Sequence, residues 1–546
     1  MSQYLASELL ADQLAVEGAR VVFGKPGSTN LPLLDTIVKR SDIRYVQSLS
    51  EATAVLIATG FAQASGKPGV IDVDSAPGLL AALAGTLNAR ESRIPLVILG
   101  GQKSTDRLNE MITSERDLCS LAAPFCKWTA QLHDPNELSR LVRRAFHEAT
   151  SPPAGPTFIS LPVDLMRLPT TSRVTMPPRM SPLGAADSSF IKRTAQLLIA
   201  STKPVLLLGN EIWQYRARSA AVSLAEVLGC PVFVESHPTG VNFPNQHPLF
   251  AGELPADREV EDTKIFEGYD VMLALGVHNR ANFLSGASTL PPTTVVVQMN
   301  TDPLLAGHGL PCHFCASADL GESLSRMRAE IQLIVDVQWV TRAKERFKET
   351  QAWIESARSA EAGQRSPGVT GDEIHLADLV RQLDTMRPLK SVIVNGFGNL
   401  SPLAMRCLKL EHGSEYLATN DRSPGYALPA ALGVKWASPE YAVICLTRDT
   451  SLLSHPQALW TAAHYNLAVK LVVLNNQRYG PAPQTGKSSD QMSMLELGDP
   501  PISFIDLAGA MGLPANTIST MSELEPGINE MLNADGPYLL DVRVPR

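Results

Sequence analysis

One stretch in the C-terminal third of the chain has the pattern of a buried strand, a tight turn and a helix: "ICLTRDTSLLSHPQALWTAAHYN", residues 444–466. A turn between a strand and a helix commonly carries glycines where a phosphate group must approach the backbone. In this turn Arg448 and Thr450 stand on either side of Asp449 instead. The stretch therefore predicts either a site for a phosphate-bearing cofactor or the remains of one.

A second polar residue, Asn476, ends the next apolar run, "VKLVVLNN". Two strands joined by a helix form a right-handed crossover, so their ends meet at the same carboxyl edge of a parallel sheet, where ligands bind. The structural alternative is that Asp449 caps the following helix and that Asn475 and Asn476 only form a turn. Both interpretations require a parallel sheet that positions the two side chains.

The rest of the chain has the pattern of such sheets. Apolar, β-branched runs alternate with helical stretches almost throughout, which is typical of α/β folds with parallel strands and crossover helices. Two segments have the composition of linkers, a proline-rich one at 168–189 and a polar one at 356–373. We therefore predict an α/β protein with three domains, at residues 1–170, 190–345 and 370–546.

Length, composition and charge favour a multidomain protein that acts on small molecules. The 546 residues are too many for a single core, and 44% of them are hydrophobic and 19% charged, as in ordinary globular proteins. The net charge of −8 gives no electrostatic reason to expect a nucleic-acid partner. The first residues lack the pattern of a signal peptide, and no apolar run reaches membrane-spanning length, so a membrane is not an expected partner either.

Seven cysteines are scattered along the chain, an odd number that favours reduced thiols and a cytoplasmic location over a framework of disulfides. Cys312 and Cys315 form a C-x-x-C pair, but no second pair follows at the spacing of a metal site. A zinc or redox role is therefore the less favoured interpretation of this pair.

Several longer segments resemble, in one order, the thiamine-diphosphate-dependent enzymes of the pyruvate-decarboxylase and acetolactate-synthase superfamily, and within it the benzoylformate decarboxylases. The segments are "VFGKPGSTNLPLLD", "SEATAVLIATGFAQASGKPG", "GYALPAALGVKWA", "ALWTAAHYN" and "LNNQRYG". The resemblance covers essentially the whole chain. It implies an enzyme that uses thiamine diphosphate and Mg²⁺ to cleave or form a carbon–carbon bond next to the carbonyl of a 2-oxo acid.

The resemblance also implies an architecture. The first domain would bind the pyrimidine ring of the cofactor, the central domain would be structural, and the third domain would bind the diphosphate. In this family the cofactor lies between the first domain of one subunit and the third domain of its partner. A homodimer, often doubled to a homotetramer, is therefore expected.

Four residues have cofactor roles that the resemblance implies. Glu51 matches the glutamate that hydrogen-bonds the aminopyrimidine ring and so promotes removal of the thiazolium C2 proton. Without the resemblance, Glu51 would only complement the first turn of a helix. Asp449, Asn476 and the backbone carbonyl of Arg478 match the Mg²⁺ ligands of the family, and hard oxygen ligands suit that ion.

The diphosphate turn departs from the family pattern. The family has Gly-Asp-Gly-Ser or a close variant where this chain has Arg448, Asp449, Thr450 and Ser451. A β-branched threonine tolerates positive φ poorly, so close approach of a phosphate to the backbone is less easy here. Arg448 either pairs with a phosphate oxygen, fills the place of a lost metal charge, or is a surface residue.

Two other segments of the third domain match cofactor-binding positions. Ser423 and Pro424 lie where the family places the residues that line the bend of the cofactor, and Pro424 would provide apolar contact without an N–H group. Gly398 and Asn399, in "NGFGN", lie where polar groups contact the diphosphate. The glycines of that segment leave mostly backbone donors.

Three positions concern proton transfer and the substrate. Asp74 stands where the benzoylformate decarboxylases have an active-site histidine, and His278 would have to be displaced to act as their second histidine. Ser28 matches the serine that contacts the substrate carboxylate, although a hydroxyl in a Pro-Gly-Ser turn is an equally good interpretation.

Two functions remain open at this point. Glu51, Asp449 and Asn476 favour a lyase or carboligase that acts on a 2-oxo acid, with an aldehyde as the acceptor where one is used. Arg448, Thr450 and the change to Asp74 favour a divergent paralogue. Such a paralogue has lost thiamine diphosphate and either serves as a structural or regulatory partner or runs different chemistry in the old pocket. The retained acidic and amide residues make the enzyme the preferred hypothesis.

Overall fold

The computed structural model describes residues 4–107, 117–178, 183–255, 265–278, 290–291, 293–308, 312–363, 372–411, 415–419, 425–479 and 494–545. The chain forms two compact units. The first unit comprises Met1–Arg179, Asp372–Asn399 and Asp421–Arg546, and the second comprises Met180–Gly371 and Leu400–Asn420.

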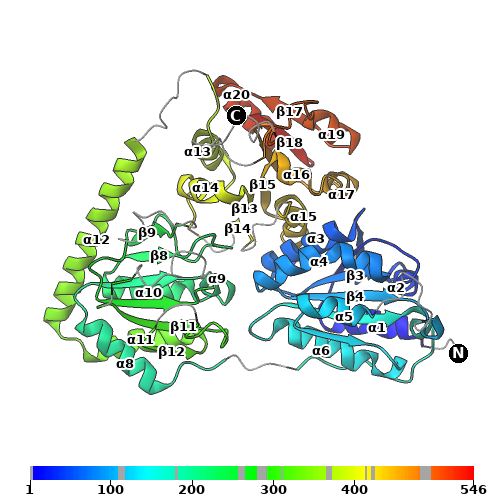
Figure 1. The fold of residues 1–546 in the computed structure, drawn as a ribbon, viewed down its shortest axis with the longest axis horizontal. Helices are drawn as coiled ribbons and strands as arrows, with labels where there is room; N and C mark the ends of the chain where they lie inside the picture. Colours follow the sequence, from blue (N-terminus) through cyan, green and yellow to red (C-terminus); the bar gives the residue numbers. More distant parts are fainter. Residues whose placement is uncertain are drawn as a thin grey trace. The chain divides into compact units, whose positions relative to one another are not determined.

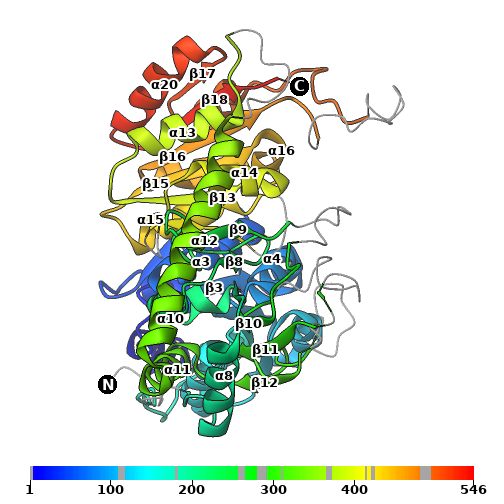
Figure 2. The same ribbon diagram turned by 90° about the vertical axis from the view of Figure 1, so that its left-hand side faces the viewer.

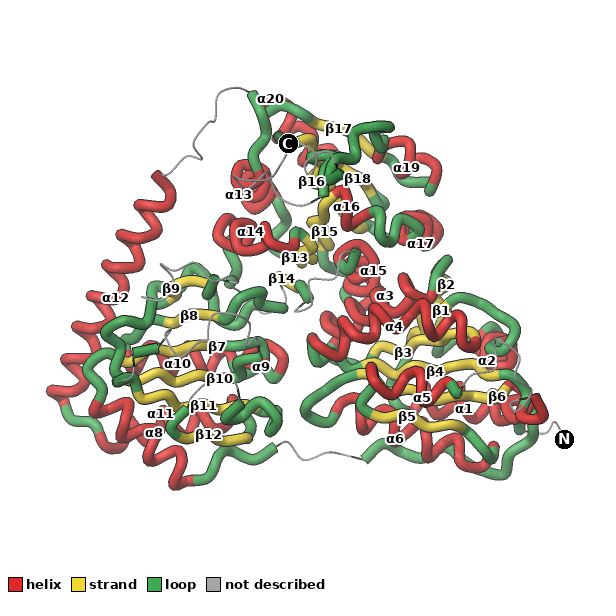
Figure 3. Tube along the Cα trace, in the orientation of Figure 1, coloured by secondary structure: helices red, strands yellow, loops and turns green. Residues whose placement is uncertain are grey.

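Three six-stranded sheets of parallel strands form the framework of the protein. The strands lie between helices in each case (Figure 3). Strands β4 (Leu96–Gln102), β6 (Pro156–Pro162) and β16 (Val469–Asn475) are buried along their whole length, because both faces of a parallel sheet are covered. The predicted α/β fold is confirmed, while the domain boundaries drawn from the linkers remain a prediction. None of the helices described here is long and apolar enough to cross a membrane.

The N-terminal sheet has the strand order β2-β1-β3-β4-β6-β5. Its remaining strands are β1 (Val21–Gly24), β2 (Arg44–Gln47), β3 (Gly69–Asp74) and β5 (Trp128–Gln131). The helices of this part of the chain (Figure 1) are α1 (Ala6–Val16), α2 (Leu31–Ile37), α3 (Glu51–Ser65), α4 (Ser75–Glu91), α5 (Leu118–Ala122), α6 (Leu138–Thr150) and α7 (Val163–Met166). Because β1 pairs with both β2 and β3, the loops that follow these three strands meet at one carboxyl edge.

The C-terminal sheet has the strand order β14-β13-β15-β16-β18-β17. Its other strands are β13 (Ser391–Gly396), β14 (Tyr416–Leu417), β15 (Ala442–Arg448), β17 (Ala515–Ile518) and β18 (Tyr538–Arg543). The helices of this part of the chain are α13 (Leu376–Met386), α14 (Ser401–Cys407), α15 (Ala427–Ala437), α16 (Asp449–Leu452), α17 (Ala458–His464), α19 (Phe504–Ala510) and α20 (Met521–Asn533). Strand β15 pairs with β13 and β16, so the ends of these three strands also share one edge.

The second unit contains the sheet β12-β11-β10-β7-β8-β9. Its strands are β7 (Pro204–Leu208), β8 (Val232–Val234), β9 (Phe250–Glu253), β10 (Val271–Leu275), β11 (Val295–Asn300) and β12 (Phe314–Ser317). Its helices are α8 (Ser188–Ala200), α9 (Glu211–Gln214), α10 (Arg218–Leu228), α11 (Leu320–Ile334) and the long α12 (Val337–Gly363), which Figure 2 shows along its length.

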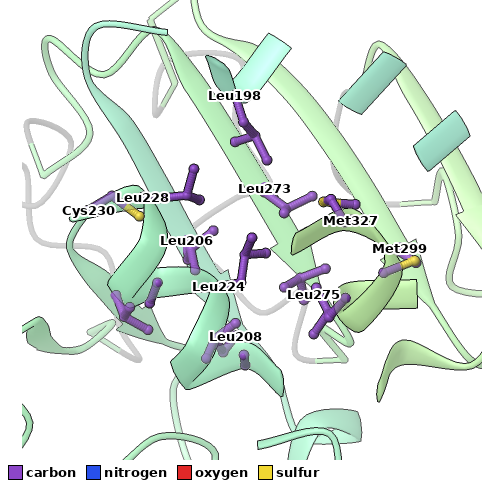
Figure 4. Close-up of a cluster of buried hydrophobic side chains, with 14 of the residues drawn as sticks. Leu198, Leu206, Leu208, Leu224, Leu228, Cys230, Leu273, Leu275, Met299 and Met327 are labelled. Atoms are coloured by element: carbon purple, nitrogen blue, oxygen red, sulfur yellow. The ribbon is translucent and has the colours of Figure 1, made fainter. Parts of the chain in front are cut away.

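Alternate residues of each strand point to opposite faces of this sheet, and in the buried strands both sets of residues are apolar. Leu206 and Leu208 of β7 pack with Leu224 of α10 and other residues of one core cluster (Figure 4). Val205 and Leu207 of the same strand belong to a separate cluster. The continuous apolar run "PVLLL" therefore covers two cores, which explains why it lacks the alternation of a half-exposed strand.

Helices α3 and α15 approach each other closely within the first unit. A Cβ atom at Gly433 would lie 1.8 Å from the carbonyl oxygen of Ile57, and a Cβ atom at Gly60 would lie 2.1 Å from that of Ala430. Only glycine leaves room for backbone at these two positions. Since α3 begins at Glu51, this contact also fixes the helix that carries the predicted catalytic glutamate.

We expect Gly433→Ala to destabilise the protein, because the added methyl group collides with a backbone oxygen that cannot rotate away. Overpacking of this kind costs about 1–3 kcal/mol, so the melting temperature measured by differential scanning fluorimetry should fall by several degrees. The matched control is Gly509→Ala in α19, where no described atom beyond the chain neighbours and the adjoining helix backbone lies within 4 Å of the added Cβ. The control should melt at the wild-type temperature or slightly above it, since alanine favours helix. Equal melting temperatures for the two variants would contradict the importance of the α3–α15 contact.

Candidate functional site

Glu51, the first residue of α3, lies at the carboxyl edge of the N-terminal sheet and is only 6% exposed. Its Oε2 lies 3.8 Å from Nζ of Lys25, a half-exposed residue in the loop after β1. Its Oε1 lies 2.8 Å from the position that a Cβ at Gly78 would take. A larger residue in this turn of α4 would therefore displace the carboxyl group. Sequence reasoning did not single out Lys25 or Gly78.

Asp74 ends β3 at the same edge and holds the turn that contains Ser28. Its Oδ1 accepts hydrogen bonds from the Thr29 backbone N–H, at 2.8 Å, and from the Thr29 hydroxyl. A Cβ at Gly27 would lie 2.2 Å from Cγ of Asp74, so the absence of a side chain there lets the carboxylate reach the turn. Ser28 itself is exposed. The structure thus brings Glu51, Asp74 and the Ser28 turn to one edge.

Asp72, in the middle of β3, is an ionisable residue that sequence reasoning missed. It is 2% exposed, and its Oδ2 accepts a hydrogen bond from the Tyr45 hydroxyl at 3.3 Å. Burial raises the pKa of Asp72 well above its ordinary value; the Tyr45 hydrogen bond acts against this, and the nearby charges of Asp74 and Glu51 add to it. The signal in the sequence was an aspartate inside the apolar run "GVIDVD".

Asp449 lies at the carboxyl edge of the C-terminal sheet, directly after β15, and is 1% exposed. Its Oδ1 accepts a hydrogen bond from the Thr450 backbone N–H at 2.7 Å. Its Oδ2 is buried and has no hydrogen-bond partner among the residues that the structure describes. Burial raises the pKa of this carboxyl, while the backbone N–H of Thr450, the Arg448 guanidinium and the backbone N–H groups of Gln477 and Arg478 lower it. The turn after β16 therefore lies beside Asp449.

Asn475 and Asn476 have different partners in that turn. Asn475 donates from Nδ2 to Oδ1 of Asp541 at 2.8 Å, and its own Oδ1 accepts from the Gln477 backbone N–H at 3.2 Å. Asn476 is half-buried, and its Oδ1 accepts from the Arg478 backbone N–H at 3.2 Å. Asn475 is thus part of the scaffold, whereas the Asn476 side chain contacts only the backbone of its own turn among the hydrogen bonds of the described residues.

The turn at Arg448 needs no glycine for its own conformation. Arg448 has φ −97°, and Thr450 and Ser451 belong to the short helix α16. Arg448 is 7% exposed, so it is not a surface residue. Burial lowers the pKa of its guanidinium and the adjacent Asp449 raises it. What distinguishes this turn from a glycine-containing one is therefore side-chain volume and charge, not backbone strain.

The other predicted positions lie in three places. Gly398, after β13, has φ +60°, and no described atom beyond its chain neighbours lies within 4 Å of where its Cβ would be; Asn399 next to it is exposed. Ser423 and Pro424 lie outside the described residues. His278 lies in the second unit, where its Nε2 is 3.4 Å from Oε1 of Glu211, and its side chain is 5% exposed. It therefore takes part in a buried network of that unit.

The residues present fit a divalent cation at Asp449. A buried carboxylate oxygen without a hydrogen-bond partner is costly in isolation, and a hard cation is the ligand that carboxylate and amide oxygens prefer. Three histidine, cysteine or acidic side chains do not gather at any one point among the described residues. Such a cation would therefore need Asn476, a backbone carbonyl and oxygens from a ligand to complete its coordination.

Comparison with known proteins places all three sheets in one family. Residues 5–121, 191–327 and 396–542 match, respectively, the N-terminal TPP-binding, central and C-terminal TPP-binding domains of thiamine pyrophosphate enzymes. The chain is 28% identical to a benzoylformate decarboxylase of Pseudomonas aeruginosa, over 96% of each chain. It is 27% identical to an acetolactate synthase large subunit of Escherichia coli, isozyme 3, over 97% of this chain and 93% of the relative. A solved thiamine diphosphate-dependent 4-hydroxybenzoylformate decarboxylase of Rhodococcus jostii superposes with a TM-score of 0.83 at 26% identity over 99% of both chains.

Replacing the buried Asp72 should make the free energy of unfolding less dependent on pH. The raised pKa means that the folded protein keeps a proton that the unfolded chain releases above the ordinary value of 3.8. Above that value, the free energy of unfolding of the wild type therefore falls by about 1.4 kcal/mol for each pH unit, until Asp72 ionises in the folded state. Asp72→Asn keeps an acceptor for Tyr45 and removes this cost. Its melting temperature should exceed that of the wild type by a margin that grows as the pH rises from the ordinary value toward the raised pKa of the folded state.

The control for this experiment is Tyr45→Phe, which removes the hydroxyl but leaves the carboxyl buried. This variant should retain the wild-type fall in stability with rising pH, because the titrating group is still present. A constant difference between Asp72→Asn and the wild type at every pH would refute the assignment.

Proposed function

Because this chain belongs to the thiamine-diphosphate-dependent enzymes of the decarboxylase and acetolactate synthase type, we propose that it is a lyase or carboligase that acts on a 2-oxo acid. The observation that carries the proposal is the buried Oδ2 of Asp449, which lies beside the Asn476 turn and has no hydrogen-bond partner in the described part of the chain. Bound thiamine diphosphate would supply an electron sink for breaking or making a carbon–carbon bond next to a carbonyl group.

The residues around Asp449 would hold the metal and the diphosphate. We assign Asp449, the Asn476 side chain and the Arg478 carbonyl to Mg²⁺, since all three provide oxygen ligands. Arg448, with its guanidinium beside that site, is assigned to a phosphate oxygen. Backbone and side-chain groups of Thr450, Ser451, Gly398 and Asn399, together with Ser423 and Pro424, are assigned to the rest of the cofactor.

Glu51 would hold a proton at the ring nitrogen of the bound pyrimidine. Its burial and its position in the first turn of α3 keep the carboxyl group in one place, which proton transfer requires. Asp74 would act through Thr29 by fixing the turn that presents Ser28. The exposed Ser28 hydroxyl would donate to the substrate carboxylate. Substrates related to benzoylformate, and an aldehyde acceptor where one is used, are consistent with the relatives' activities.

We propose that a second copy of the chain covers α4, in a homodimer or homotetramer. The exposed residues of α4 form an apolar stripe at helical spacing that includes Pro77, Leu80, Ala84 and Leu87, and Leu80 is 53% exposed. The opposite face of the same helix holds Gly78 against Glu51. A partner on this stripe would therefore be separated from the proposed catalytic glutamate by the width of α4, and we propose that domains 1–170 and 370–546 of different subunits share a cofactor.

Calorimetry tests the cofactor proposal directly. Wild-type protein should bind thiamine diphosphate in the presence of Mg²⁺ and much more weakly without it. Asp449→Asn should weaken the Mg²⁺-dependent binding by about tenfold or more, because it removes the charged ligand. Glu51→Gln should bind the cofactor like the wild type but release CO₂ from benzoylformate about a hundredfold more slowly, since the proton donor is lost.

Two results would overturn parts of this assignment. If the wild type gives no heat with saturating thiamine diphosphate and Mg²⁺, the chain is a divergent paralogue that has left thiamine chemistry. If Glu51→Gln turns over substrate at the wild-type rate, Glu51 has no part in the reaction.

A charged residue on the α4 stripe should separate the subunits. Leu80→Glu places a carboxylate in the proposed apolar interface, so light scattering at micromolar concentration should show a smaller species than for the wild type. The control is Leu333→Glu in α11, where the leucine is 82% exposed and a charge should leave the oligomer intact. A wild-type monomer would contradict the proposal, and so would a Leu80→Glu variant of unchanged mass.

A further inference from the structure

Cys312 and Cys315 lie together in the second unit, at the edge strand β12. Both are free thiols, Cys315 at an exposed position and Cys312 at a half-buried one. A Cβ at Gly307 would lie 3.0 Å from Sγ of Cys315 and 4.0 Å from Sγ of Cys312. The two sulfurs therefore converge on the same glycine.

The loop that carries Gly307 is fixed above the two sulfurs. Gly307 has φ +75°, and its N–H donates to Oε1 of Gln298 at 3.1 Å. Gln298 is 1% exposed, lies opposite Cys315 in the β11–β12 pairing, and donates from Nε2 to the Leu305 carbonyl at 2.9 Å. The buried side chain of Gln298 thus holds Gly307, which has no Cβ, at a position where a larger residue would collide with the sulfur of Cys315.

The two thiols differ in their access to solvent. Cys315 is exposed, whereas Cys312 is half-buried, and burial together with the neighbouring Cys315 raises the pKa of the Cys312 thiol. Cys126, Cys230 and Cys445 are buried, so their thiols are out of reach of a reagent in solution. Cys315 is therefore placed to react first, with Cys312 behind it as the second thiol.

We propose that Cys312 and Cys315 are a redox-active dithiol that exchanges with low-molecular-weight disulfides. Cys315 loses its proton to solvent and its thiolate attacks one sulfur of the small disulfide, which forms a mixed disulfide and releases one small thiol. Cys312 then loses its proton and attacks Sγ of Cys315, which closes the Cys312–Cys315 disulfide and releases the second small thiol. The protein dithiol is oxidised by two electrons, and the small disulfide is reduced to two thiols.

This inference is independent of the thiamine proposal, because it requires no residue at either carboxyl edge of the first unit. The pair is then a site of reversible oxidation and not a buried structural pair. Neither a metal nor a catalytic residue is needed for the exchange.

Peptide mass analysis tests the proposal on the full-length protein. The protein is incubated with glutathione disulfide and its remaining thiols are alkylated with N-ethylmaleimide. The peptide that contains Cys312 and Cys315 should have lost two hydrogens and carry no alkyl group, and dithiothreitol should restore both alkylation sites. If both cysteines of this wild-type peptide remain fully alkylated, the proposal is wrong.

Two variants test the order of the steps. Cys312→Ser lacks the second thiol, so it should accumulate a glutathionyl group on Cys315 that does not resolve. Cys407→Ser is the matched control, and the pair in this variant should oxidise like the wild type. If wild-type protein accumulates the Cys315 mixed disulfide to the same extent as Cys312→Ser, the two thiols do not act as a pair.

Discussion

The contact between α3 and α15 is the constraint on which the rest of the first unit depends. Gly60 and Gly433 bring two helices to backbone contact, and each helix belongs to a different sheet. Because α3 begins at Glu51, the position of that carboxyl follows from packing along the whole helix and not from its immediate neighbours. A glutamate that must meet a ligand at a fixed point needs this kind of support.

One buried carboxyl group in each of the N-terminal and C-terminal parts of the first unit has a raised pKa, but the surroundings of the two groups differ. Removal from water raises the pKa of both Asp72 and Asp449. Asp72 accepts a hydrogen bond from the Tyr45 hydroxyl, and its burial nevertheless raises its pKa well above the ordinary value. Asp449 has one oxygen without a hydrogen-bond partner in the ranges that the structure describes, and several nearby N–H groups favour its charged form. Only the second arrangement leaves a place for a cation.

The sheets, the strand ends and the family could be predicted from the sequence because they depend on local periodicity and on long matching segments. The continuous apolar runs predict parallel strands, and Asp449 and Asn476 follow from where two of those runs end. Glu51 was predicted only from its place in a segment that matches the family. The Asp72–Tyr45 pair could not be predicted, since it depends on β1 lying between β2 and β3 and on Gly24, whose added Cβ would lie 2.4 Å from the Tyr45 hydroxyl. The burial of Arg448 could likewise not be predicted, because it depends on how far the turn lies below the protein surface and not on residue type.

The state of Asp449 bears on what Arg448 does. If the arginine had taken the place of a lost metal ion, its guanidinium would donate to the free oxygen of the neighbouring carboxylate, as buried ion pairs do. Among the described residues, Oδ2 of Asp449 has no such donor although Arg448 is adjacent in the chain and buried. The described residues therefore do not show the ion pair that a guanidinium in place of a lost metal ion would form with this oxygen.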